Sequence, residues 1–329
     1  MPEKIKRKKS VSYAKYGYIF SIPFVLAFAV FMLYPTIYTI VIGFTDLKGV
    51  IPGPMHFLED PFANFKGILS NQTFIKSFFN TLIIWIANFI PQMGLALVLT
   101  AWFTNRNRKI VGQGAFKVLF YLPNIITQAT IAILFSCLTA YPKGVINDLL
   151  LSLGWIDGAY FFQQSTVWAK IIVAFIQFWM WYGYTTIILI SGVLGIDPGL
   201  FEAAEIDGAT PTQTFFKITL PCMRTILVFT LITSLVGGLN MFDIPKLFVW
   251  NGGPDNSTMT ASVFIYSKAF SGTYLYNEAA AASMIMFIII AILSAIVFYL
   301  MRDRVDSKNK KEMKRIERAE KKALKEAAK

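Results

Sequence analysis

Apolar residues dominate six long stretches of the chain, and shorter polar segments separate them. The stretches run over Tyr16–Thr45, Phe79–Thr104, Ala115–Thr139, Val167–Leu194, Thr225–Trp250 and Ala282–Met301. Each offers the roughly 20 residues that a helix needs to cross about 30 Å of hydrocarbon. Strands of a membrane barrel would be about ten residues long and would alternate in polarity. The pattern therefore predicts an all-α integral membrane protein with six transmembrane helices.

Composition agrees with this class. Of the 329 residues, 55% are hydrophobic and only 15% are charged, whereas about 25% of the residues of a soluble domain are charged. The basic segment EKIKRKKS ahead of the first stretch is also a feature of secretion signals. However, the apolar run continues well beyond the roughly 7–15 residues of a signal peptide, and no small-residue cleavage site follows. We therefore expect a retained membrane anchor.

Charge predicts the orientation. If the N-terminus lies in the cytoplasm, the cytoplasmic segments hold 24 of the 31 lysines and arginines. Six are in the N-terminal segment, four in Asn105–Lys117, two in Gly195–Arg224 and twelve in the tail from Arg302. Short cytoplasmic loops are enriched in such residues, so we expect a multi-pass cell-membrane protein with both termini in the cytoplasm. The net charge of +12 follows from this bias, and a nucleic-acid partner is not needed to explain it.

The chain divides into three parts by composition. Residues 1–15 form a basic cytoplasmic segment, residues 16–301 the six-span domain and residues 302–329 a charged cytoplasmic tail. Lysine and arginine are favoured near anionic lipid headgroups, so we expect the tail to lie close to membrane lipids. A contact between the tail and a cytoplasmic partner is the alternative.

A polar segment between the fourth and fifth stretches reads EAAEIDGATPTQTFFKITLP. Just before it, Asp197 can cap a helix and Pro198 suits the first helical position. Gly208 can take the left-handed conformation just past the helix end. These signals predict a helix over residues 198–207, too short and too acidic to cross a bilayer. Thr210-Pro211 then starts a second helix that leads into the fifth span.

The exposed chemistry of this short helix suits a partner. Glu202 and Glu205 lie near the positive end of the helix dipole, where basic groups of a partner could reach them. Ala203 and Ala204 are small enough to let another surface approach the helix backbone. A plain connector between two spans remains the alternative on spacing alone.

The segment also resembles a known motif. Glu202-Ala203-Ala204, then Asp207-Gly208 and finally Ile218, Leu220 and Pro221, is similar to the EAA loop of ABC importer permeases. The full segment looks like the form found in carbohydrate-uptake permeases of the maltose/multiple-sugar type. The resemblance extends to the Tyr-Pro and Gly-Phe-Thr-Asp of the first stretch and to Gly252-Gly253-Pro254 after the fifth.

This resemblance implies a six-span permease core whose short helix couples to a separate ATPase. The residues that would carry the coupling are Glu202, Ala203, Ala204, Asp207, Gly208 and Pro221. The implied partners are a second homologous permease, two cytoplasmic ATPase subunits, an extracellular solute-binding protein and a carbohydrate substrate. ATP and magnesium would be bound by the ATPase subunits.

The chain offers no catalytic chemistry of its own. A phosphate-binding loop of the G-x-x-x-x-G-K-[ST] type is absent from the sequence, so energy must come from another subunit. We find no credible pairing of a nucleophile with a base, and we expect a non-catalytic subunit without a cofactor. His56 is the one histidine, which makes a zinc site improbable. Cys137 and Cys222 fall at opposite membrane ends in this topology, too far apart for a disulfide.

Polar side chains within the spans are costly and often mark a pathway. In the fifth stretch, Gly237, Asn240 and Asp243 share a helical face at i, i+3 spacing. In the fourth, Gln177, Trp181 and Tyr184 lie roughly on one face, and in the second, Asn88 and Gln92 sit beside Pro91. Amides suit sugar hydroxyls, and aromatic faces suit the apolar faces of sugar rings. The alternative is interhelical packing, because small residues and amides often join spans.

The favoured interpretation is therefore one permease subunit of an ATP-driven carbohydrate importer. The same machinery carrying a polyol phosphate would require cationic residues facing the cavity, and the spacing reveals none. An ion-driven secondary transporter would predict inverted repeats and would leave the polar segment unexplained. A structural anchor would not need polar residues in three spans.

Overall fold

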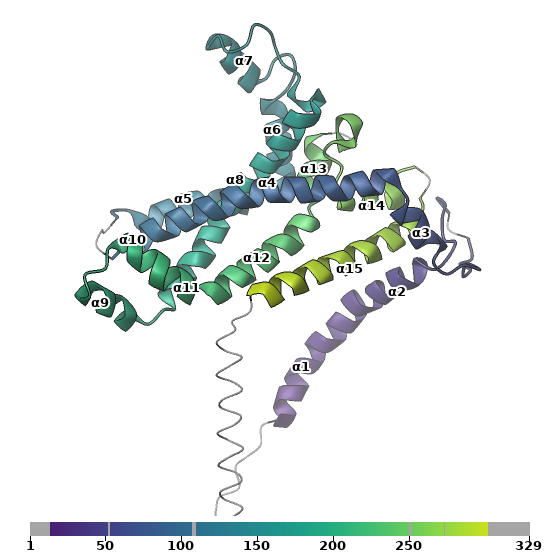
Figure 1. The fold of residues 1–329 in the computed structure, drawn as a ribbon. Helices are drawn as coiled ribbons and strands as arrows, with labels where there is room; N and C mark the ends of the chain where they lie inside the picture. Colours follow the sequence, from purple (N-terminus) through teal and green to yellow (C-terminus); the bar gives the residue numbers. More distant parts are fainter. Residues whose placement is uncertain (1–13, 52, 107–109, 250–251, 273, 302–329) are drawn as a thin grey trace, which may run out of the picture. The chain divides into compact units, whose positions relative to one another are not determined.

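The computed structural model describes residues 14–51, 53–106, 110–249, 252–272 and 274–301. Within these ranges the elements are helices (Figure 1), and an isolated antiparallel bridge joins Thr45 to Phe57. The predicted all-α class is confirmed. The described residues form two compact units: unit 1 takes those up to Asn71 together with Ile265–Ile285, and unit 2 takes Gln72–Phe264 and those from Met286 onward.

In the part of the chain that the structure describes, five helical segments are long and apolar enough to cross a membrane. They are Lys15–Ile42, Gln72–Phe103, Thr166–Leu194, Arg224–Phe248 and Tyr276–Met301. A pair of helices, Gln113–Ile125 and Gln128–Leu138, counts as a sixth candidate span if its two members are taken together. With the bent pair counted as one span, the number agrees with the six predicted spans. The third span then consists of two helices and not of one straight helix.

Unit 1 contains the first span. Helix α1 (Ala14–Phe28), the π-helical turn η1 (Ala29–Leu33) and α2 (Tyr34–Ile42) follow one another without a gap. The widened turn lies just before Pro35, which has no amide hydrogen and whose ring crowds the preceding turn. Helix α3 (Ala63–Leu69) fixes the end of the span, because the Asn64 amide donates to the carbonyls of Gly43 and Thr45, each at 2.9 Å.

Unit 2 is built around two long helices, α4 (Gln72–Phe103) and α8 (Thr166–Leu194), which pack along one another. Helix α5 (Gln113–Ile125) packs on α8 at Gly183, where an added Cβ would overlap the backbone of Phe120. The apolar core includes Ile84 of α4 and Ile176 and Met180 of α8, all almost fully buried. These contacts place the polar residues of the two helices at a tightly packed interface.

The third predicted span is not a straight helix. Helices α5 and α6 (Gln128–Leu138) meet at a bend of 88°. Pro123 lies in the last turn of α5, Ile126 has an extended backbone, and the Thr127 hydroxyl caps α6 by accepting from the amide of Thr130. A continuous apolar run predicted one element, but the proline and the capping threonine inside it end one helix and begin another.

The fifth predicted span is also interrupted. Helix α12 (Arg224–Leu239) ends at Asn240, and α13 (Asp243–Phe248) begins three residues later. Glycine is a poor helix former, and Gly237-Gly238 occupy the last turn of α12. The prediction that Gly237, Asn240 and Asp243 share one continuous helical face is therefore wrong, since the three lie on either side of this break.

The three long loops, which follow the first, third and fifth spans, carry short helices of their own. Beyond α3, they are α7 (Val145–Ser152), η2 (Phe162–Gln164), η5 (Pro254–Asn256) and α14 (Ala261–Phe270), and α15 (Tyr276–Met301) is the last span. The second loop folds around Asn147, whose amide donates to the carbonyls of Ala140 and Tyr160 and accepts from the amide of Tyr160.

Candidate functional site

The short helix predicted over residues 198–207 is present as α9 (Pro198–Ile206), with Asp207 at its C-terminal cap. The Asp197 carboxylate accepts a 2.9 Å hydrogen bond from the amide of Gly199 and so caps the helix. Gly208 has φ +72°, the left-handed conformation in which glycine avoids the cost of a Cβ. Both predicted ends of the helix are confirmed, and Figure 1 shows α9 at one end of unit 2.

The second predicted start is confirmed at Thr210. Its hydroxyl accepts from the amide of Gln213, and the Gln213 side chain accepts from the amide of Thr210, which completes a capping box. The elements α10 (Pro211–Thr214), η3 (Phe215–Thr219) and α11 (Leu220–Cys222) then lead into α12. Pro221 lies in α11, exposed, in the segment that joins α9 to the fifth span.

The two faces of α9 differ in chemistry. Glu202, Ala203, Glu205 and Asp207 are exposed. Ala204 is only 5% exposed, so it lies against the chain itself. Of the two alanines expected to admit another surface, Ala203 alone is on the free face. That face combines carboxylates with a small residue and is open to a partner.

Two of the three residues predicted to share a face of α8 are in contact. The rings of Trp181 and Tyr184 meet edge to face with centroids 5.6 Å apart, and Trp181 packs against the apolar core. Gln177 is 6% exposed, and within the described part of the chain no hydrogen bond engages its amide. The polar atoms of its side chain are not among the fully buried ones that lack a partner, so the Gln177 amide reaches a surface at which a ligand can bind.

The predicted pair on α4 serves packing in this structure. Gln92 donates a 2.7 Å hydrogen bond to the Thr185 hydroxyl of α8, and Asn88 donates to the carbonyl of Ile84 one turn earlier. Both amides are buried. The alternative interpretation, that amides join the spans, therefore describes Gln92 better than a role in the pathway does.

At the end of α12, Asn240 is exposed and donates to the carbonyl of Val236 at 2.8 Å. Asp243 is exposed at the start of α13. The two glycines ahead of them play different parts. Gly237 faces open space, whereas an added Cβ at Gly238 would overlap the indole of Trp85 from α4. Gly238 thus admits a neighbouring helix, and Gly237 is the one with room for a ligand.

A contact that sequence reasoning missed holds the loop after α13 to the N-terminal end of α4. The Lys76 ammonium donates to the Asp255 carboxylate at 2.6 Å. The Asn80 amide donates to the carbonyls of Asn256 and Met259. The hydrogen bond with Lys76 lowers the pKa of Asp255 below its ordinary value. The partners lie far apart in the sequence. The Gly-Gly-Pro motif therefore indicated a loop but could not predict that Lys76 and Asn80 hold it in place.

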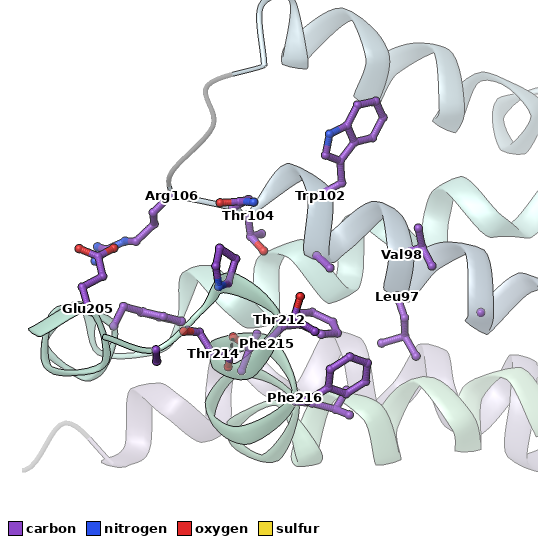
Figure 2. Close-up of a pocket in the computed structure, with 18 residues that line it drawn as sticks. Leu97, Val98, Trp102, Thr104, Arg106, Glu205, Thr212, Thr214, Phe215 and Phe216 are labelled. Atoms are coloured by element: carbon purple, nitrogen blue, oxygen red, sulfur yellow. Dashed lines mark hydrogen bonds between the residues drawn. The ribbon is translucent and has the colours of Figure 1, made fainter. Parts of the chain in front are cut away.

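A groove that sequence reasoning also missed lies between the end of α4 and the segment around α9 and α10. Its volume is about 600 Å³, and its walls include Leu97, Val98 and Trp102 on one side and Phe215 and Phe216 on the other (Figure 2). Among the described residues, no group of three His, Cys, Asp or Glu side chains could hold a metal ion. Cys137 and Cys222 are free thiols.

Long apolar helices, a buried polar interface between two of them and a capped polar helix at one end define a membrane transport subunit. The chain belongs to the family of binding-protein-dependent transport system inner membrane components, whose family model matches residues 63–311. This finding confirms the resemblance drawn from the segment that begins at Glu202.

Individual relatives cover most of the chain. It is 30% identical over 289 residues to the lactose transport system permease protein LacF of Rhizobium radiobacter, covering 88% of this chain and 94% of LacF. It is 28% identical to the arabinooligosaccharides transport system permease protein AraP of Bacillus subtilis, covering 85% and 86%. The fold is similar to that of a bacterial ABC transporter involved in the import of the acidic polysaccharide alginate. For that structure the TM-score is 0.74 at 22% identity, covering 88% of this chain and 95% of the other.

Proposed function

We propose that this chain is one permease subunit of an ATP-driven, binding-protein-dependent importer of sugars or oligosaccharides. It forms half of the pathway across the membrane and couples to a separate ATPase through α9. The relatives named for lactose and arabinooligosaccharides support the substrate class. Helix α9 supports the coupling, because a capped helix of nine residues with an exposed acidic face is built to meet another protein.

The assembly that this function requires has several further members. They are a second homologous permease, two cytoplasmic ATPase subunits that bind ATP and magnesium, and an extracellular solute-binding protein. A protein of the last kind is present in the complex of the alginate transporter with its oligosaccharide-bound periplasmic protein. The basic residues near α9 support a cytoplasmic position for this helix, because lysine and arginine are enriched in short cytoplasmic loops. With this orientation, both termini of the chain also lie in the cytoplasm.

Within the pathway, Gln177, Trp181 and Tyr184 of α8 form the proposed contact surface for the sugar. The Gln177 amide would donate to and accept from hydroxyls, and the two rings would pack on the apolar faces of sugar rings. Asn240 lies at the break between α12 and α13, where its side chain is exposed. Its bond to Val236 lies within the same turn and can be exchanged for one to a substrate.

An anionic solute is a second candidate substrate, favoured by one observation. Lys170 lies two turns before Gln177 on the same face of α8 and is near Lys76 and Asp255. Lys76 pairs with Asp255, and the charge of Lys170 nearby leaves a net positive charge at the outer end of the proposed path. A substrate with a phosphate or carboxylate would offset that charge. Lys170→Gln should then weaken uptake of the charged solute and leave uptake of a neutral sugar unchanged.

Purification of the tagged chain from its native membrane tests the assembly. We expect an ATPase with a phosphate-binding loop and a second permease to copurify in fixed ratio. Glu202→Lys should reduce the ATPase in the purified complex, because it reverses a charge on the free face of α9. Recovery of the chain as a homo-oligomer without any ATPase would overturn the proposal.

A second experiment tests the pathway. Tyr184→Ala removes a packing surface, and Asn240→Ala removes one neutral hydrogen bond, worth about 0.5–1.5 kcal/mol. Each should change sugar preference or slow uptake several-fold while the amount of assembled complex stays the same. Parental uptake of every tested sugar by both variants would assign recognition to the partner permease or the solute-binding protein instead.

A further inference from the structure

Helix α9 touches the rest of unit 2 through very few side chains. Of its nine residues, Phe201 and Ala204 are the two that are not exposed. No other helix of the described chain packs along its length. Any force on α9 must therefore reach the spans through these two side chains or through the chain at its two ends.

Phe201 is the larger of the two contacts. Its ring packs against a buried cluster made by Ala96 of α4, Leu189 and Val193 of α8, and Met223 just before α12. Three candidate spans thus meet at the point where the ring is inserted. A close-packed interior has low compressibility and transmits displacement, so movement of this ring is passed to all three.

Arg106 covers the same ring from outside the cluster. Its guanidinium carbon lies 5.3 Å from the centroid of the Phe201 ring, within the range of a cation–π interaction. Arg106 follows the end of α4 by three residues. The interaction therefore ties α9 to the chain leaving α4, in addition to the contact within the cluster.

Open grooves lie on both sides of this contact. The groove of about 600 Å³ described above, with Arg106 in its wall (Figure 2), also includes Phe201. A second groove of about 580 Å³ includes both residues as well. The second extends toward Gln113 and Lys117 of α5. Because no described side chain fills these spaces, α9 has room to move and to carry the Phe201 ring with it.

We propose that Phe201, seated in the cluster and covered by Arg106, is the joint that transmits displacement of α9 to α4, α8 and α12. Phe201 acts as a positioning residue, since it holds the helix that meets the ATPase. The proposal rests on the function proposed above, in which α9 docks on that subunit. It adds which contact carries the movement from α9 to the spans.

The test uses the complete transporter in proteoliposomes. A cysteine in place of Ala203, on the free face of α9, reports docking by cross-linking to the ATPase. Two further quantities are measured: the ratio of hydrolysis stimulated by the loaded solute-binding protein to basal hydrolysis, and uptake. We expect Phe201→Ala to retain the cross-link. Its stimulation ratio and its uptake should each fall by roughly 2- to 30-fold, the range for one residue of a coupling network.

Matched variants separate the joint from general packing. Phe201→Tyr keeps the ring and should restore both quantities, and Arg106→Lys should be milder than Arg106→Gln because it keeps the cation. Phe216→Ala removes an equal ring from the wall of the same groove and should behave as the parent. Phe201→Ala with parental stimulation and uptake would overturn the proposal.

Two further outcomes are equally decisive. Loss of the cross-link in assembled Phe201→Ala would show that the ring serves docking and not transmission, which overturns the inference alone. Absence of the cross-link in the parent complex would overturn the docking of α9, and with it the proposed coupling function.

Discussion

Gly208 offers a sharp test of how the end of α9 is formed. Its φ of +72° is one that side chains with a Cβ rarely adopt, and an added Cβ there would meet no atom within 4 Å. Gly208→Ala therefore adds backbone strain without a clash. The left-handed conformation costs a residue with a Cβ about 1–2 kcal/mol, which corresponds to a roughly 5- to 30-fold loss in population of the native turn.

Relaxation of that strain would turn the chain away from Thr210 and change the direction of α9. We expect uptake by the reconstituted transporter, and ATP hydrolysis stimulated by the solute-binding protein, to fall by up to this factor. Binding of substrate to the solute-binding protein should be unchanged. Gly208→Asn should cost less, because asparagine tolerates the left-handed conformation.

Gly112 supplies the matched control. It has φ +73° and equally open surroundings, but it precedes α5 and not α10. Gly112→Ala adds the same strain and should lower stability to a similar degree without reducing stimulated hydrolysis. Parental uptake in Gly208→Ala, or equal losses of uptake and stimulated hydrolysis in the two variants, would refute a specific role for the turn after α9.

The remaining predictions concern the spans and the orientation. Gln177→Ala should change sugar preference without lowering the thermal stability of the complex. Gln92→Ala should lower stability by about 0.6–1.7 kcal/mol and leave sugar preference unchanged. The reverse result would assign substrate contact to Gln92 and packing to Gln177. Gly238→Ala should reduce assembly because its Cβ overlaps Trp85, whereas Gly237→Ala should assemble normally, and equal yields would contradict the described packing. In a cysteine-free background, Gly53→Cys should react with an impermeant thiol reagent added outside intact cells. Protection from that reagent would reverse the proposed orientation.

Local sequence rules predicted the ends of α9 and the start of α10 well. Asp197, Gly208 and Thr210 act through neighbours within three or four residues, and the structure contains each of those contacts. Helix capping depends on such short-range bonds. The segment on which the resemblance to the family was drawn is also the one whose helix ends sequence reasoning placed accurately.

Hydrophobicity alone did not predict the shape of the spans. The apolar run of the third span hid the bend at Ile126, although Pro123 and Thr127 carried the signal for it. In the fifth, the spacing of Gly237, Asn240 and Asp243 predicted one helical face, but the helix breaks at Asn240. Apolar length indicates that a segment can cross a membrane, and backbone geometry decides whether it does so as one helix.

Contacts between distant residues lay beyond the sequence patterns. Lys76 and Asp255 pair across 179 positions, and Gly238 is fitted to Trp85 of another helix. Neither contact has a local signature. For the proposed pathway, the sequence placed Trp181 and Tyr184 on one face, and their rings are in contact. It could not distinguish Gln177, which has no described partner, from Gln92, whose partner is Thr185.

The central claim is that this chain is a permease subunit whose transport depends on ATP and on a solute-binding protein. Uptake by proteoliposomes that contain the complete complex tests it most directly, with a panel of labelled sugars that includes lactose and arabinooligosaccharides. We predict accumulation of at least one sugar only when ATP is present on the ATPase side and the loaded solute-binding protein on the other. Accumulation driven by an ion gradient without ATP, or without the solute-binding protein, would contradict the claim.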